Sequence, residues 1–259
     1  ILQLTPLLRG LKETYPESRI YFLTGRDFVP LLEGNRHVDA IIPFPEKRYR
    51  YLLKNKPERY TSVFNELYDL ICELREKKFD LAVNRQYEWG AVFACLVGAR
   101  KILGGSYSSE RGFYFEDEVS KNLFDTIRCD RKANRRNLVD WACRTAGLPP
   151  GDYGPMYLCA GPVARKEAER LIYAGNGRPL VGVQIGAAKP FRRWGADNFA
   201  DVIKRLINEK LRKVVLIGSV DERDLSESVV RMLGEEKKNL INLTGKTSLK
   251  TTAAVLEKC

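Results

Sequence analysis

Small residues and cations follow one another in the segment at residues 180–194, LVGVQIGAAKPFRRW. Gly186, Ala187 and Ala188 have little or no side chain, so the backbone there can approach a ligand closely and present its N–H groups to an anion. Three cations stand just beyond this turn: Lys189, Arg192 and Arg193. The combination predicts a phosphate-binding turn. An ordinary loop with solvated lysine and arginine side chains is the alternative.

The elements on either side of this turn would position it. Residues 180–185 are rich in β-branched and aliphatic side chains, which is typical of a strand buried on both faces of a parallel sheet. After Trp194, apolar residues recur at helical spacing, and we expect a helix near residues 196–208. The cations therefore lie near a helix N-terminus, where free N–H groups and the helix dipole favour anions.

Two acidic residues, Asp221 and Glu222, follow another predicted strand at residues 214–217. Ligands of open α/β folds bind at the carboxyl edge of the sheet, and a carboxylate there can accept hydrogen bonds from two ribose hydroxyls. Capping of the helix predicted at residues 222–233 is the alternative function of these acids.

The segment at residues 243–248, LTGKTS, is similar to the end of a Walker A motif, G-x-x-x-x-G-K-[ST]. That interpretation fails, because the first glycine would stand at the position of Leu240. The segment instead predicts a loop that ends in a helix cap, Thr247 or Ser248, before a helix at residues 249–256.

Cations also concentrate between residues 46 and 59, where tyrosines are interleaved with them: Lys47, Arg48, Arg50, Lys54, Lys56 and Arg59. The interleaved tyrosines favour a phosphorylated, partly apolar ligand. A solvated helix or loop is the alternative.

Composition limits the classes of protein to consider. The chain has 259 residues, of which 44% are hydrophobic and 30% charged, as in soluble globular proteins with room for two domains. Its formal net charge of +11 calls for an anionic partner or surface. Zinc-finger spacing, RNP-type aromatic motifs and basic heptads are all missing from the sequence, so a phosphorylated substrate explains the charge as well as nucleic acid does.

Cysteine and histidine usage argues against a metal centre. The six cysteines are widely spaced and form no C-x-x-C pair, so we expect reduced, mostly buried thiols. His37 is the only histidine, so neither a Ser-His-Asp triad nor a histidine metal cluster can be built. No apolar run reaches the roughly 18 residues of a membrane span, and the N-terminus lacks signal-peptide regions, so we expect a cytoplasmic protein.

The order of the predicted elements indicates an α/β fold with two domains. Turn residues at 147–152 suggest a boundary, and we place the domains at residues 1–155 and 156–259. From residue 180 onward, strands at 180–185, 214–217 and 240–242 alternate with helices, which predicts a parallel, doubly wound sheet. Before the boundary we expect strands at 19–23, 40–44, 79–84 and 101–103, a loop at 104–112, and helices near 26–32, 63–74, 89–96, 134–146 and at the start of the chain.

The words GAAKPFRRW and GADNFADVIKRL resemble the donor-domain signature of glycosyltransferase family 9, the ADP-heptose:lipopolysaccharide heptosyltransferases. The segment L-x-G-x-T-S-L at residues 243–249 and the pattern of the first strands extend the resemblance over essentially the whole chain. Two departures are visible. Gly195 replaces the usual Pro after the Trp, and Ala187 and Ala188 stand where some members carry hydroxyl residues. Phosphate contacts would then fall to backbone N–H groups and to Arg192.

This resemblance implies a GT-B architecture, with two Rossmann-like, doubly wound domains facing a cleft, the first acceptor-binding and the second donor-binding. It implies inverting, metal-independent transfer of a heptose or related sugar from an ADP-sugar to a phosphorylated lipopolysaccharide core acceptor. The nucleotide sugar is a substrate, and we expect no cofactor. As partners we expect the donor, the acceptor and a peripheral contact with the inner membrane surface, but no nucleic acid.

The resemblance also implies roles for individual residues. Arg192, helped by Lys189, would stabilise the leaving group. The donor would be bound by Gly186, Ala187, Ala188, Glu222, Thr247 and Ser248. The acceptor phosphates would be bound by Lys47, Arg48 and Arg50. The family's Asp general base would stand just before Ile1, after a first strand that is missing here, and its D-x-G-x-x-H motif just after Cys259, so we expect no catalytic base within the chain and no activity of the chain as written.

Two alternative functions stay open at this point. One is a GT-B nucleotide-sugar enzyme with a different donor. The other, favoured only by the net charge, is a non-catalytic nucleic-acid-binding protein, whose affinity would fall steeply with salt.

Overall fold

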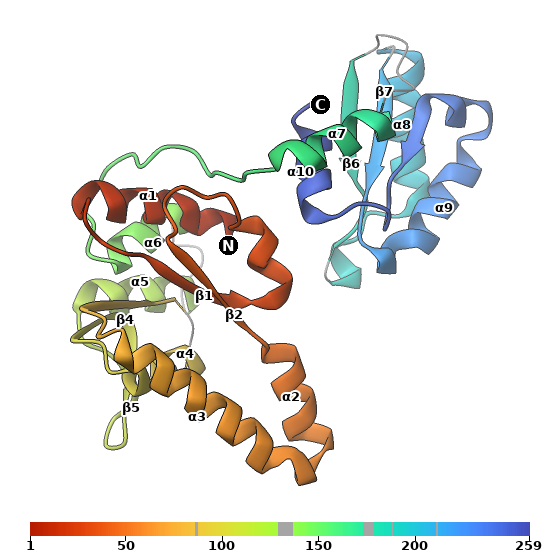
Figure 1. Ribbon diagram of the computed structural model, residues 1–259. Helices are drawn as coiled ribbons and strands as arrows, with labels where there is room; N and C mark the ends of the chain where they lie inside the picture. Colours follow the sequence, from red (N-terminus) through yellow and green to blue (C-terminus); the bar gives the residue numbers. More distant parts are fainter. Residues whose placement is uncertain (86–87, 129–136, 173–178, 188, 211) are drawn as a thin grey trace. The chain divides into compact units, whose positions relative to one another are not determined.

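The computed structural model describes residues 1–85, 88–128, 137–172, 179–187, 189–210 and 212–259. The chain divides into two compact units, Ile1–Tyr157 and Leu158–Cys259, and each is described by itself (Figure 1). The predicted boundary, between residues 155 and 156, lies two residues before this division.

The second unit is built on a parallel sheet of three strands in the order β6-β7-β8. The strands are β6 (Leu180–Gln184), β7 (Lys213–Ile217) and β8 (Leu240–Asn242). Every residue of the central strand β7 is buried. The parallel sheet predicted for this half of the chain is therefore confirmed.

Helices cover both faces of this sheet because side chains of β7 alternate between them. Val214 and Leu216 pack with residues of α8 (Ala196–Asn208) and α9 (Arg223–Met232). Val215 and Ile217 pack on the other face with α7 (Gly161–Ile172) and α10 (Leu249–Leu256). Figure 1 shows the two pairs of helices on opposite sides of the strands. The sequences of these strands are continuously apolar because helices cover both faces of the sheet.

The first unit contains two small sheets. One pairs β1 (Tyr21–Gly25) in parallel with β2 (Ala40–Phe44). The other has the order β3-β4-β5, formed by β3 (Leu81–Asn84), β4 (Lys101–Ser108) and β5 (Gly112–Phe115). Strand β3 runs parallel to β4, and β4 antiparallel to β5.

Six α-helices of the described residues accompany these strands: α1 (Thr5–Thr14), α2 (Glu46–Asn55), α3 (Tyr60–Glu76), α4 (Glu88–Val97), α5 (Glu118–Arg128) and α6 (Leu138–Thr145). Leu7 of α1 packs with Ala142 and Cys143 of α6 in a buried cluster. The helix predicted at 26–32 is a short 3₁₀ segment, Arg26–Leu31.

The predicted loop at residues 104–112 is wrong. Strand β4 continues to Ser108 and forms a hairpin with β5, in which Gly105 pairs with Phe115 and Tyr107 with Phe113. The small and polar residues along β4 give no apolar pattern from which a strand would be predicted. The apolar side chains of the hairpin lie on the partner strand. Helix α5 was not predicted either.

Among the described residues, no helix is long and apolar enough to cross a membrane. The described cysteines are free thiols: Cys72, Cys95, Cys143, Cys159 and Cys259. Cys129 lies outside the described residues.

Candidate functional site

The loops that follow the three parallel strands of the second unit meet at the carboxyl edge of its sheet. The Gly245 N–H, after β8, donates to the Gly218 carbonyl, after β7, at 2.9 Å. The Glu222 carboxylate lies against Gly186, which follows β6. Three separate sequence segments therefore meet in one cluster. Ligands bind at this edge of the sheet in open α/β folds.

Glu222 is held in a fixed position at this edge. Its side chain is buried, with 9% of the residue exposed. The Ser219 N–H donates to Glu222 Oε2 at 2.6 Å, as part of a capping box at the start of a short 3₁₀ helix. The helix-capping function expected as an alternative is therefore formed. This hydrogen bond uses Oε2, and Oε1 is the oxygen that lies nearer to Gly186.

Gly186 makes room for that carboxylate. A β-carbon on Gly186 would overlap the Glu222 carboxyl group, and one on Gly218 would lie 2.8 Å from Glu222 Oε2. The small residues of the turn thus have a packing function in addition to exposing their backbone. Ala187 is half-buried beside Gly186. Ala188 lies outside the described residues.

The LTGKTS segment supplies the third side of the cluster. Ser248 caps α10, where its hydroxyl accepts a hydrogen bond from the Thr251 N–H at 3.0 Å. The hydroxyls of Thr247 and Thr252 lie 2.8 Å apart. Lys246 donates to the Asn242 carbonyl at 3.0 Å, so its side chain folds back onto the end of β8. The capping interpretation of this segment is confirmed.

Thr244 is a candidate residue that the sequence analysis missed. It is 1% exposed, and its hydroxyl oxygen has no hydrogen-bond partner among the described residues. A β-carbon on Gly218 would lie 3.0 Å from Thr244 Cγ2, which places the residue beside the meeting point of the loops. Its position two residues after β8, inside the predicted LTGKTS segment, was the available signal.

The cations of the turn are exposed to solvent. Arg193 Nε donates to the Ala187 carbonyl at 3.1 Å, so this side chain folds back over the turn. Arg192 Cζ lies 5.7 Å from the centre of the Phe191 ring. Within the described ranges, no carboxylate forms a salt bridge with Lys189, Arg192 or Arg193. Their charge is therefore available to an anionic ligand.

The three cations predicted to bind an acceptor lie on α2 in the first unit, and each has a carboxylate partner. Lys47 pairs with Asp27, and Arg50 pairs with Glu46. Arg48 pairs with Glu66 of α3 through both terminal guanidinium nitrogens, Nη1 and Nη2, the second at 2.9 Å. The hydrogen bond from Arg48 is the main reason that the pKa of Glu66 is lowered to about 2. A phosphate bound here would compete with these carboxylates.

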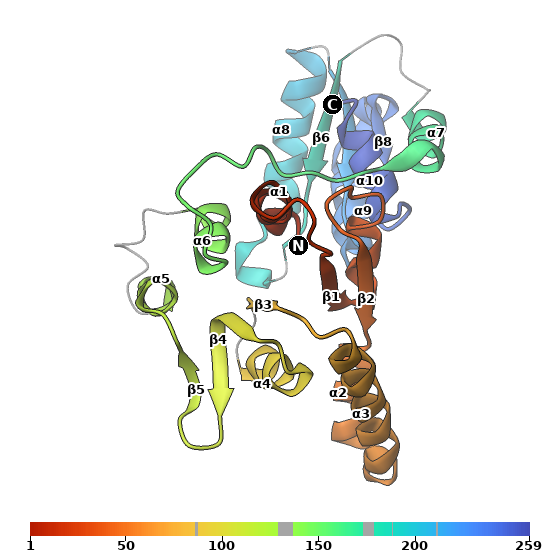
Figure 2. The ribbon, with the colours of Figure 1, turned by 60° about the vertical axis from the view of Figure 1, so that its left-hand side comes forward.

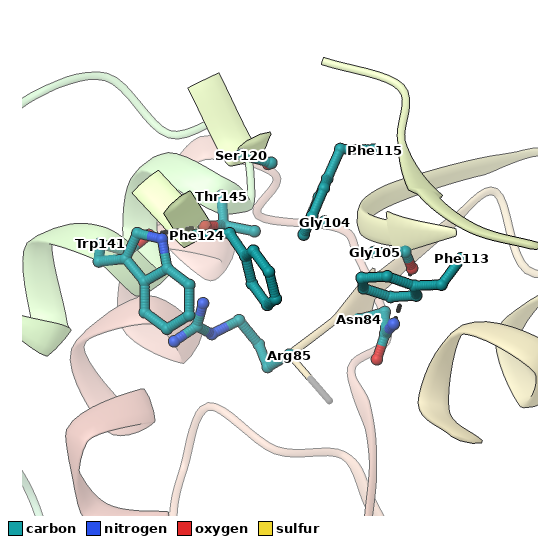
Figure 3. A pocket seen from close by; sticks show the side chains of 10 residues that line it. All are labelled: Asn84, Arg85, Gly104, Gly105, Phe113, Phe115, Ser120, Phe124, Trp141 and Thr145. Atoms are coloured by element: carbon teal, nitrogen blue, oxygen red, sulfur yellow. Dashed lines mark hydrogen bonds between the residues drawn. The ribbon is translucent and has the colours of Figure 1, made fainter. Parts of the chain in front are cut away.

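A small cavity in the first unit was not predicted. Its volume is about 110 Å³, and it opens between the end of β3, the β4–β5 hairpin, α5 and α6 (Figure 3). The residues that line it are Asn84, Arg85, Gly104, Gly105, Phe113, Phe115, Ser120, Phe124, Trp141 and Thr145. Aromatic walls with a few polar groups are typical of ligand pockets.

The polar groups of this cavity are held in place. Arg85 Cζ lies 3.4 Å from the centre of the Trp141 ring, a cation–π contact. Asn84 Nδ2 donates to the Gly105 carbonyl at 2.7 Å (Figure 3). Gly104 has φ +87°, and a β-carbon there would overlap the Asn84 carbonyl oxygen. The adjacent glycines at 104 and 105 were the available sequence signal for this close packing.

Known proteins share this fold. A crystal structure of a family 9 glycosyl transferase from Veillonella parvula aligns with a TM-score of 0.75 and 21% identity, over 100% of this chain and 70% of that one. The Escherichia coli heptosyltransferase WaaC with ADP-2-deoxy-2-fluoro heptose aligns with a TM-score of 0.64 and 15% identity, over 100% of this chain and 76% of that one. These likenesses confirm the expected α/β fold of the GT-B class.

Sequence comparison leads to the same family. A lipopolysaccharide heptosyltransferase 3 from Escherichia coli is 26% identical over 233 residues, which are 87% of this chain. This chain spans 62% of the length of that relative. The family model described as glycosyltransferase family 9 (heptosyltransferase) matches residues 67–259, about three quarters of the chain. The chain therefore belongs to glycosyltransferase family 9, the heptosyltransferase family.

Proposed function

We propose that this chain binds the donor and the acceptor of an enzyme that transfers a heptose from ADP-heptose to a phosphorylated lipopolysaccharide core sugar. In this reaction an acceptor hydroxyl attacks the anomeric carbon, and its proton passes to a general base. The bond from that carbon to the ADP oxygen breaks, and ADP leaves with the bonding electrons. The relatives named as heptosyltransferases, one of them with an ADP-heptose analogue, support this choice of donor.

The observation that carries the proposal is the buried Glu222 carboxylate at the carboxyl edge of the sheet, in the space that Gly186 leaves. A carboxylate held there can accept hydrogen bonds from the ribose hydroxyls of ADP. The backbone of Gly186 and Ala187 and the exposed cations Lys189 and Arg192 lie on the next loop, where they can meet the diphosphate. We assign Ala188 and the Thr247–Ser248 caps to the same donor site.

Charge development decides the function of the cations. The departing ADP gains negative charge as the bond to the sugar breaks, so a cation placed there stabilises the transition state more than the bound donor. Arg192, with Lys189 beside it, has this role in our proposal, and a metal ion or other cofactor is not required.

The acceptor would be bound by Lys47, Arg48 and Arg50 of α2. Their carboxylate partners keep the side chains ordered before binding, and a phosphate with two negative charges can displace a single carboxylate. We also propose that the enzyme works at the cytoplasmic face of the inner membrane, where a lipid-anchored acceptor is accessible.

Nucleotide binding by the 259-residue chain tests the donor site. Isothermal titration should show binding of ADP that is tighter than that of 2′-deoxy-ADP, because Glu222 loses a ribose hydroxyl partner in the deoxy nucleotide. In Glu222→Gln this discrimination should fall at least several-fold, whereas Asp221→Asn, the matched control one residue away, should keep it. Absence of ADP binding, or full discrimination in Glu222→Gln, would contradict the proposal.

A further inference from the structure

Helix α3 carries large aromatic side chains on its solvent face. Tyr60, Phe64 and Tyr68 recur every fourth residue and are 48%, 67% and 58% exposed. We call them the aromatic stripe. Residues at this spacing lie one above the other on a helix. The buried residues of α3, Val63 and Leu74, lie on a neighbouring face of the helix, so the packing of α3 does not use the stripe.

Cations gather at the end of the hairpin that α3 forms with α2. Lys54, Lys56 and Arg59 are exposed, and none of them has a carboxylate partner within the part of the chain that the structure describes. We call them the cationic tip. They differ in this respect from Lys47, Arg48 and Arg50, each of which is paired. Residues 46–59 contain six basic and only two acidic residues, so the tip is strongly positive.

The cationic tip and the aromatic stripe are continuous. Tyr60 follows Arg59 directly, and its hydroxyl donates to the Leu53 carbonyl of α2 at 3.0 Å, which fastens the start of the stripe to the tip. In both views α2 and α3 extend away from the strands of their unit (Figures 1 and 2).

We infer that the cationic tip and the aromatic stripe bind the surface of a bilayer that contains anionic phospholipids. Tyrosine and phenylalanine side chains enter the boundary between headgroups and acyl chains, and lysine and arginine are attracted to the negative surface beside it. An exposed aromatic patch of this kind on a soluble protein marks an interaction site.

The arrangement of the rings favours lipid over nucleic acid. The Phe64 and Tyr68 rings are stacked on each other, with their centres 6.4 Å apart and an angle of 18° between their planes. Rings that contact each other in this way leave less of their faces free to stack on successive bases, which is how aromatic residues bind single strands. Their edges still offer apolar surface to a bilayer.

This inference rests on the proposed function only for its purpose, which is to bring the enzyme to a lipid-anchored acceptor. Binding to lipid itself needs neither donor nor acceptor. It can therefore be measured apart from sugar transfer, and failure of one does not imply failure of the other.

Vesicle flotation with the 259-residue chain tests the inference. The probe is a vesicle of equal parts phosphatidylglycerol and phosphatidylcholine, compared with phosphatidylcholine alone. We expect binding to the anionic vesicle only, at least a tenfold loss in Lys54→Gln/Lys56→Gln/Arg59→Gln, and about a tenfold loss in Phe64→Ser/Tyr68→Ser. Salt should weaken vesicle binding by the wild-type chain, and the residual binding of the variant without the three cations should depend less on salt.

The controls separate location from charge and from folding. Lys210→Gln/Lys237→Gln/Lys238→Gln removes the same charge from exposed positions of the second unit and should keep vesicle binding. Circular dichroism should show that each variant is folded. Equal binding of all variants, or equal binding to both vesicles, would overturn the inference. Binding to duplex DNA through the same three cations without vesicle binding would overturn it in favour of a nucleic-acid surface.

Discussion

The carboxylate of Glu222 occupies the space in which a side chain on Gly186 would lie. The two residues follow different strands, β6 and β7, and are 36 positions apart in the sequence. Their contact links the turn that we assign to the diphosphate with the acid that we assign to the ribose. Each residue therefore limits what the other position can carry.

Gly186→Ala should disturb both stability and nucleotide binding. The new methyl group must push Glu222 away, which in a packed site costs on the order of 1–3 kcal/mol. We expect a lower midpoint of urea unfolding and at least tenfold weaker ADP binding. Gly151→Ala is the matched control, because its β-carbon would make only ordinary contacts with Tyr153. If Gly186→Ala bound ADP as tightly as wild type, the Glu222 side chain could move aside without loss of binding, which would contradict this prediction.

Arg192 and Arg193 should differ in kinetic effect. Arg192→Ala should lower kcat about a hundredfold, the loss typical of an electrostatic contact worth about 3 kcal/mol in the transition state. Arg193 donates to the Ala187 carbonyl, so Arg193→Ala should mainly raise the donor KM by loosening the turn. The measurement is steady-state transfer in the protein that carries this chain. A greater fall in kcat for Arg193→Ala would reverse the two assignments.

The cations of α2 should act on the acceptor. Replacing Lys47, Arg48 and Arg50 together by Gln should raise the acceptor KM at least tenfold and leave the donor KM nearly unchanged. Glu66→Gln should lower the acceptor KM, because Arg48 no longer has a competing carboxylate. Equal effects on both substrates would show that these cations are structural or solvated.

The Arg48–Glu66 pair should also make stability depend on pH. The pKa of Glu66 is lowered from 4.5 to about 2, chiefly by the hydrogen bond from Arg48. A depressed carboxyl pKa stabilises the fold above pH 4.5, and this contribution is lost as the pH falls toward 2. Glu66→Gln should therefore differ from wild type at neutral pH and converge with it in acid. The difference should be small, since the pair is half-exposed.

Urea midpoints at several pH values measure this effect. Glu58→Gln is the control, because Glu58 is exposed and forms no salt bridge with a described residue. A gap between wild type and Glu66→Gln that stays constant down to pH 2 would contradict the assigned pKa.

Two glycines of the β4–β5 hairpin should respond differently to alanine. Both have positive φ, +87° for Gly104 and +66° for Gly112. A β-carbon at Gly112 would meet nothing within 4 Å, whereas one at Gly104 would overlap the Asn84 carbonyl. Gly112→Ala should cost about 1 kcal/mol of stability from strain alone. Gly104→Ala should cost at least about 3 kcal/mol. Equal midpoints of thermal unfolding would refute the steric argument.

The second unit could be predicted closely because its signals are local. Apolar runs that alternate with helical periodicity predict the first and last residues of α8, β8 and α10 as the structure has them. The hairpin of β4 and β5 could not be predicted, because Gly105 and Ser106 carry no apolar pattern, and the aromatic residues Phe115 and Tyr114 that pair with them lie on the other strand. The pattern of apolar residues along one strand does not identify the strand that pairs with it.

The candidate site was predictable in part for the same reason. Words such as GAAKPFRRW and LTGKTS identify which loops matter, since each lies directly after a strand. Arg48 and Glu66 lie on different helices and are 18 residues apart in the sequence. Arg85 and Trp141, which are also in contact, are farther apart still. Nothing in the local sequence encodes such pairs, so the partners of the predicted cations emerged only from the structure.

The two helices on one face of the second sheet, α7 and α10, come from the beginning and the end of that unit. Thr251 donates to Glu167 at 2.6 Å, and Arg165 pairs with Glu257 at 2.9 Å. The strands between them pair in the order in which they are synthesised, so early contacts close only short loops. The cluster around Ala168 and Val255, in contrast, can form only after α10 has left the ribosome. Until then α7 packs only against the strands and lacks the cover that α10 provides, and this interval is when the nascent unit most needs protection from aggregation.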